Sequence, residues 1–142
     1  MDFAQVFAVS AAGMSVQRTR VEVAALNLAN AHSVQAPGAE GYQPQRVVVT
    51  PSLSFEEQVA TGLQAAVLPG ATIEPAATSP RMVHDPGHPM ADARGFVRQA
   101  GIDAATEMLT LMSAMRSYEA NVAALNTARA LALKTLEIGR GA

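Results

Sequence analysis

All eight prolines of this 142-residue chain fall between Pro37 and Pro89. Proline lacks a backbone hydrogen-bond donor, and its ring breaks the interior of a helix. The chain before Pro37 and the chain after Pro89 can therefore form long helices, whereas prolines interrupt the segment between them. This distribution predicts a helix at each end of the chain and an irregular segment in the middle.

The N-terminal helix is expected from about Phe3 to about Asn30, a length of about 40 Å at 1.5 Å per residue. Its apolar or small side chains recur in steps of four and three, which is the spacing of a coiled-coil seam. The members of this stripe are Phe3, Phe7, Ser10, Met14, Val21, Ala24 and Leu28, with Gln17 interrupting the series.

The C-terminal helix is expected from about Asp103 to about Ile138, a length of about 50 Å. The acidic residues Asp103 and Glu107 suit the start of a helix, where the macrodipole favours negative charge. A second stripe follows along this helix, less strictly toward its end. Its members are Met108, Leu111, Met115, Tyr118, Val122 and Leu125, and it continues to Leu136.

The middle segment, residues 31–102, is expected to hold loops and short β-strands. Arg46–Thr50 is rich in valine and predicts a strand. Arg81–His84 and Gly95–Arg98 are weaker candidates for strands. Residues 56–80 show little pattern.

Two long helices at opposite ends of a chain pair most simply in antiparallel fashion. The predicted fold class is therefore mainly α, with the terminal helices forming a coiled-coil-like hairpin around a small, irregular, β-containing middle segment. The expected division is an N-terminal helix (1–30), a middle segment (31–102) and a C-terminal helix (103–142). Alanines occur all around the second helix, and a helix that is small or apolar on most faces requires neighbours on most faces. This pattern predicts an assembly of several subunits.

Composition excludes several classes of partner and site. Ten basic and twelve acidic residues give a net charge of −2, which offers no basic surface for nucleic acid. Lys134 is the only lysine, so a polybasic membrane anchor is not expected either. Without cysteine the chain has no disulfide and no thiolate metal ligand.

The sequence shows no typical targeting or membrane segment. The first residues lack the basic and apolar regions of a cleaved secretory signal, so no such signal is expected. No stretch reaches the roughly 18 uninterrupted apolar residues of a spanning helix.

Neither catalytic nor metal-binding residues are predicted. His84 and His88 could be metal ligands, but Pro86 and Gly87 between them break any helix that would align the two rings, so a polar turn is the preferred interpretation. No nucleophile elbow, phosphate loop or paired-carboxylate motif is present. We therefore expect no cofactor, no small-molecule substrate and no enzyme activity.

Segments at both ends of the chain resemble one known family. Ala25–Ser33 resembles the signature near the N-terminus of flagellar rod and hook proteins, and Ser10–Arg20 resembles the proximal-rod version of it. The matching C-terminal segments are His88–Val97, Glu107–Met108, Arg116–Asn121 and Lys134–Arg140. His32-Ser33 departs from a position where threonine is common, and residues 56–80 match nothing. The short length favours a proximal-rod member.

The resemblance implies a structural subunit of the bacterial flagellar basal body, located in the periplasmic rod. Its implied partners are copies of itself, other rod proteins, the rotor (MS) ring with its rod adaptor, and the flagellar type III export apparatus. It also implies a mechanical function, the transmission of torque along a helical drive shaft. The residues expected to pack between subunits or to carry the family motif are Phe3, Phe7, Gly13, Met14, Val21, Asn27, Leu28, Asn30, Met108, Leu111, Met115, Arg116, Tyr118, Asn121, Val122, Leu125 and Leu136.

Some of these residues have two interpretations. Asn27 and Asn121 either set the register of a helix pair or form ordinary solvent and helix-end contacts. Gly13 costs about 1 kcal/mol relative to alanine in a helix, and a close helix crossing is the preferred explanation. For the whole chain, the alternatives are another proximal-rod protein, a membrane-associated helical hairpin and a small hydrolase.

Overall fold

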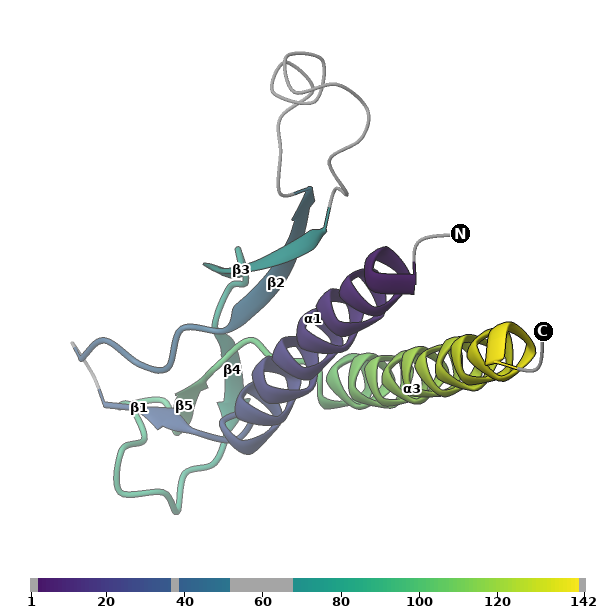
Figure 1. Ribbon diagram of the computed structural model, residues 1–142. Coiled ribbons are helices and arrows are strands. Elements are labelled where there is room, and N and C mark those ends of the chain that lie inside the picture. The colour runs from purple at the N-terminus through teal and green to yellow at the C-terminus, as the bar shows by residue number, and fades with distance from the viewer. Residues whose placement is uncertain (1–2, 37–38, 52–67, 141–142) are drawn as a thin grey trace, which may run out of the picture. The chain divides into compact units, whose positions relative to one another are not determined.

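The computed structural model describes residues 3–36, 39–51 and 68–140. Helix α1 comprises Phe3–Ala29 and helix α3 comprises Ala104–Arg140 (Figure 1). Both helices predicted from the sequence are confirmed. Two small sheets lie between them along the chain.

Side chains at the helix ends explain where each helix begins or stops. The Asp103 carboxylate accepts hydrogen bonds from the backbone N–H of Ala105 (3.3 Å) and from the Thr106 hydroxyl, which caps the start of α3. These hydrogen bonds lower the pKa of the Asp103 carboxyl, and the bond from Thr106 has the largest effect. At the end of α1, the Asn30 amide donates to the carbonyl oxygen of Leu26 (2.9 Å) and its oxygen accepts from the Ser33 hydroxyl (3.1 Å).

A three-stranded antiparallel sheet contains β1 (Val34–Gln35), β4 (Arg81–His84) and β5 (Phe96–Gln99), in the order β1-β5-β4. Val97 on the central strand is 1% exposed and pairs with Val83. The prediction for Arg81–His84 is confirmed.

The strand predicted at Gly95–Arg98 is present with a shift of one residue, since β5 runs from Phe96 to Gln99. Gly95 adopts a φ of 78° and donates its N–H to the carbonyl oxygen of Asp92 (3.0 Å), so it belongs to the preceding turn. Positive φ is a conformation that glycine adopts without steric cost.

The second sheet pairs β2 (Gln45–Pro51) with β3 (Pro69–Pro75). An ion pair between Arg46 and Glu74 joins the two strands, with 3.1 Å between Nη2 and Oε2. The predicted strand at Arg46–Thr50 is confirmed. Strand β3 was not predicted, because proline at both ends and glycine at its second position conceal the usual strand signal.

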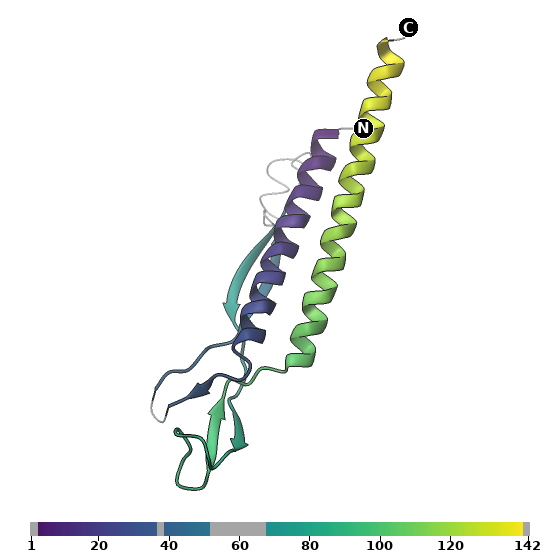
Figure 2. The same cartoon turned by 90° about the horizontal axis from the view of Figure 1, so that it is seen from below.

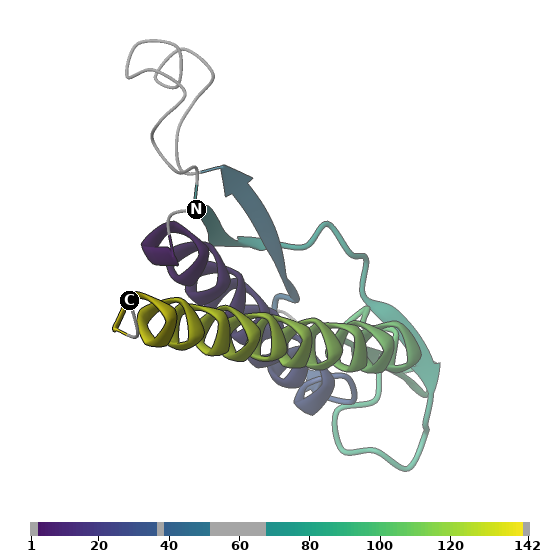
Figure 3. The ribbon, with the colours of Figure 1, turned by 45° about the vertical axis from the view of Figure 1, so that its right-hand side comes forward.

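Contacts divide the chain into two compact units, each containing part of both helices. The first unit consists of Met1–Thr19, Val48–Thr72 and Ser113–Ala142, and the second of Arg20–Val47 and Ile73–Met112. In the first unit α1 and α3 lie side by side and antiparallel (Figures 2 and 3), with Gly13 next to Asn121. In the second unit Asn27 of α1 is bonded to Glu107 of α3, again in antiparallel order. The predicted fold class is thus confirmed.

Small residues form the contact between the helices in the first unit. The buried residues there are Ser10, Val16, Ala114 and Ala128. In contrast, Met115 and Tyr118 of the predicted C-terminal stripe are 48% and 40% exposed. These two side chains are therefore not buried within the chain, and their packing between subunits stays a prediction. Small residues such as Gly13 and Ala114 allow the helices to approach closely, whereas Met115 and Tyr118 remain largely exposed.

Candidate functional site

The buried amide of Asn27 forms the centre of a hydrogen-bond network in the second unit. Asn27 as a whole is only 1% exposed to solvent. The amide nitrogen donates to the carbonyl oxygen of Gln45 (2.7 Å) and to Oε1 of Glu107 (3.2 Å). The amide oxygen accepts from the Tyr42 hydroxyl (2.8 Å) and from the backbone N–H of Gln45 (3.0 Å). These four bonds use the full capacity of an amide, so one side chain joins α1, the start of β2 and α3.

Burial also changes the acidity of two members of this network. Burial raises the pKa of the Glu107 carboxyl; the hydrogen bond from Asn27 opposes this effect and the negative charge of Asp103 adds to it. Burial, followed by the charge of Glu107, raises the pKa of the Tyr42 hydroxyl. Both groups therefore favour their neutral forms more strongly than they would in water.

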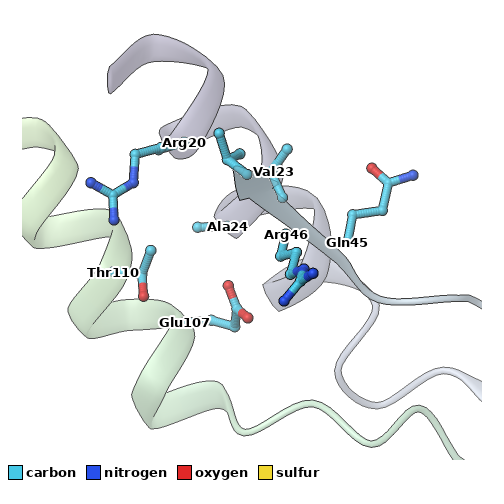
Figure 4. Close-up of a pocket in the computed structure, with 8 residues that line it drawn as sticks. Arg20, Val23, Ala24, Gln45, Arg46, Glu107 and Thr110 are labelled. Carbon is cyan, nitrogen blue, oxygen red and sulfur yellow. The ribbon is translucent and has the colours of Figure 1, made fainter. Parts of the chain in front are cut away.

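A cavity of about 220 Å³ lies beside this network, between α1, β2 and α3. In Figure 4 the Arg20 guanidinium reaches from α1 toward α3, and the Arg46 guanidinium and Glu107 carboxylate point toward the cavity. Val23 and Ala24 contribute an apolar wall. The lining contains charged and hydroxyl groups suited to binding a polar side chain.

Large apolar side chains are exposed on α3. Met108, Leu109 and Met112, here called the outer apolar patch, are 54%, 68% and 62% exposed. Helical periodicity turns them away from Glu107, which is bonded to α1. Contiguous exposed apolar side chains on a helix mark an interaction surface.

The end of α3 also exposes apolar side chains, in the first unit. Leu133, Leu136 and Ile138 are 52%, 65% and 75% exposed. Figure 2 shows α3 continuing past the first turn of α1, so no part of α1 covers this end. A neighbouring molecule could bury these side chains.

The structure distributes the sequence-predicted residues over all degrees of burial. Asn27 is buried. The half-buried residues are Phe3, Phe7, Gly13, Met14, Val21, Leu28, Asn30, Leu111, Asn121, Val122 and Leu125. The exposed residues are Met108, Met115, Arg116, Tyr118 and Leu136.

Two of these residues, Gly13 and Asn121, come together directly. A methyl group placed on Gly13 would lie 3.0 to 3.2 Å from the Asn121 amide atoms. The close helix crossing predicted at Gly13 is therefore present within the chain.

Several members of the Asn27 network and of the outer apolar patch are not predicted from the sequence. Tyr42 and Gln45 join the Asn27 network across 15 and 18 residues of sequence, which no local pattern could reveal. Met112 could have been found, because it stands four positions after Met108 and three after Leu109 and so neighbours both on the helix surface.

His84 is the last residue of β4, and His88 lies in the turn that follows this strand. The His84 ring packs edge-on against Phe96, with 5.0 Å between ring centroids. The His88 Nδ1 accepts a hydrogen bond from the backbone N–H of Met90 (3.1 Å). The turn expected at this position is present, with the His88 N–H donating to the carbonyl oxygen of Asp85 (3.2 Å).

The described residues contain neither a candidate metal site nor a candidate membrane-spanning helix. Residues 3–36, 39–51 and 68–140 contain no group of three or more histidine, cysteine or acidic side chains placed to hold a metal ion. Within the same ranges, neither helix combines the length and apolar character needed to cross a membrane.

The chain is similar to known proteins along its whole length. A family model described as flagellar basal body rod FlgEFG protein C-terminal matches residues 93–138. The flagellar basal-body rod protein FlgC of Escherichia coli O6:H1 is 36% identical over 140 residues, covering 99% of this chain and 100% of that protein. FlgC of Yersinia enterocolitica is 37% identical with the same coverage. FlgC of Bacillus subtilis is 32% identical, covering 93% of this chain and 95% of that protein.

Proposed function

Because the chain belongs to the FlgC family of flagellar basal-body rod proteins, we propose that it joins copies of itself and other rod proteins in a helical drive shaft. It is a structural subunit of the rod of the flagellar basal body. Its finer role is the transmission of torque from the rotor ring to the distal rod. That role needs many contacts that resist shear together, and it needs no catalytic residue.

The outer apolar patch is the observation that carries this proposal. Met108, Leu109 and Met112 each expose more than half of their surface. Burial of apolar surface contributes about 25 cal/mol per Å², so three large side chains supply a substantial part of a subunit contact. Contacts between unlike faces of identical subunits extend into a helical filament when the rotation between them does not close.

The segment division follows the same proposal. The helical segments 1–30 and 103–142 form the core of the rod, and the middle segment 31–102 faces outward. Within the core, the half-buried and exposed residues of the predicted set, such as Phe7, Met115 and Leu136, pack between subunits.

Export as an unfolded chain through the flagellar type III apparatus, without cleavage, fits the use of the N-terminal residues in packing. Ser10 and Val16 of α1 are buried in the first unit. The proposed location is the periplasmic part of the basal body, next to the MS ring and its rod adaptor.

Electron microscopy of basal bodies from a strain lacking this gene tests the function, alongside a swimming assay. The expected result is membrane rings without a rod in cells that do not swim, with both defects reversed by the wild-type gene on a plasmid. Intact rods in swimming cells would contradict the proposal.

A further inference from the structure

The cavity between α1, β2 and α3 contains one charged group whose partner is not supplied within the described chain. Arg46 is bound to Glu74 at 3.1 Å. Glu107 accepts the hydrogen bond from Asn27. The Thr110 hydroxyl donates to the carbonyl oxygen of Thr106 (3.0 Å). For Arg20, in contrast, no hydrogen bond or ion pair is found among residues 3–36, 39–51 and 68–140.

Arg20 and Glu107 line the same cavity without forming an ion pair with each other within the 4.0 Å limit for such pairs. The Glu107 carboxylate is held on the other side by Asn27. The uncommitted charge of the cavity is therefore positive.

We propose that this cavity is a socket for an aspartate or glutamate side chain of a neighbouring rod subunit, which pairs with the Arg20 guanidinium. The inference rests on the proposed function, because it names a contact of the assembled rod. The guanidinium offers several N–H donors in a planar fork, and a carboxylate can accept two of them at once.

The size and lining of the cavity fit this occupant. A water molecule takes up about 30 Å³ in the liquid, so about 220 Å³ holds several waters or one acidic side chain with water around it. Val23 and Ala24 are buried, and they give the methylene groups of the incoming side chain an apolar wall. Partial exclusion of solvent strengthens a charge pair relative to one on an open surface.

Charge substitutions at Arg20, introduced on a plasmid into the strain lacking the gene, test the socket. Arg20→Glu reverses the charge, Arg20→Gln removes it, and Arg20→Lys retains it. Arg94→Glu is the matched control, because Arg94 is an exposed arginine in the turn before β5, outside the cavity. Rods per basal body are counted by electron microscopy, and urea denaturation of each purified chain reports its folding.

The expected result is a loss of rods of about tenfold or more for Arg20→Glu, a smaller loss for Arg20→Gln, and near-normal rods for Arg20→Lys and Arg94→Glu. The urea midpoints of the Arg20 variants should match that of the wild type. Suppressors of Arg20→Glu should replace an acidic residue of a rod subunit by lysine or arginine, and that residue identifies the occupant.

Three results would overturn the socket. Normal rods with Arg20→Glu would show that rod assembly does not depend on the positive charge of Arg20. Suppressors found only at Glu107 would assign Arg20 to a pair within its own chain. If Arg20→Glu fails to fold, Arg20→Gln decides the matter, and a folded Arg20→Gln chain with normal rods would count against the proposal. Each of these leaves the proposed function intact as long as the wild-type gene restores rods to the deletion strain.

Discussion

Asn27 illustrates how one buried polar side chain can organise contacts that lie far apart in sequence. The sequence alone is compatible with a register-setting residue or with ordinary solvent and helix-end contacts. The structure shows a third role, since its amide joins the backbone of Gln45, the Tyr42 hydroxyl and Glu107. The family motif could point to the residue, but its partners depend on tertiary folding.

Replacement of Asn27 by alanine should reduce the free energy of unfolding by about 3 kcal/mol, because several buried groups would lose their partners. Tyr42→Phe removes one bond only, and we expect a loss of about 1 kcal/mol. Urea denaturation followed by circular dichroism measures both. Asn126→Ala is the control, since Asn126 is an exposed asparagine on α3. Equal losses for Asn27→Ala and Asn126→Ala would refute the role of the network.

Glu107 should give the chain a measurable pH dependence. Its pKa is raised in the folded state, so the folded chain binds this proton more tightly than the unfolded chain. The corresponding stability is fully present below the unfolded pKa, about 4.3, and is lost as the pH rises through the folded pKa. Glu107→Gln keeps an acceptor for Asn27 but cannot ionise.

The wild-type free energy of unfolding should therefore fall relative to that of Glu107→Gln as the pH rises from about 4.3. Urea denaturation of both chains at a series of pH values measures this difference. If the difference in the free energy of unfolding between the two chains stays constant across the pH series, ionisation of the partly buried Glu107 carboxyl does not destabilise the fold.

At the scale of elements, the helices could be predicted from the sequence but their contact face could not. The positions of proline and the repeat of apolar residues predict both helices, and α1 and α3 agree with them to within two residues at each end. The repeat alone does not distinguish a face buried within the chain from a face available to another chain. In the first unit the smaller residues, including Gly13 and Ala114, make the internal contact.

The Gly13–Asn121 contact should cancel or reverse the stabilisation that replacing glycine by alanine usually gives a helix. Gly13→Ala in a helix normally stabilises by about 1 kcal/mol. Here the added methyl group would crowd the Asn121 amide at 3.0 to 3.2 Å, so we expect no gain or a loss. In a chain that already carries Asn121→Ala, Gly13→Ala should stabilise. A double-mutant cycle by urea denaturation measures the coupling, and additive effects would rule out the steric contact.

Strands were predicted less completely than helices. Valines in β2 and β4 gave a usable signal, whereas β1 contains two residues and β3 carries proline at both ends. Such short or proline-flanked strands are defined by their partners in the sheet, and a single sequence does not show these partners.

At the scale of the whole molecule, folding of the chain and its assembly into the rod depend on different side chains. Met112→Glu should leave the free energy of unfolding of the isolated chain within about 0.5 kcal/mol, because surface substitutions have small effects. The same change should block rod assembly by placing a charge in a contact between subunits. Met82→Glu introduces the same charge at an exposed methionine of β4 (53% exposed), outside the outer apolar patch, and should assemble far better. Equal assembly of the two variants would show that the outer apolar patch is not part of the contact between subunits.

The central claim is that the outer apolar patch is buried when the chain enters the rod. The natural sequence has no cysteine, so a single Met112→Cys substitution creates one thiol at this patch. Alkylation of that thiol should be fast in the purified chain and strongly slowed in isolated basal bodies that contain the variant. Equally fast alkylation in the purified chain and in basal bodies with intact rods would contradict the account.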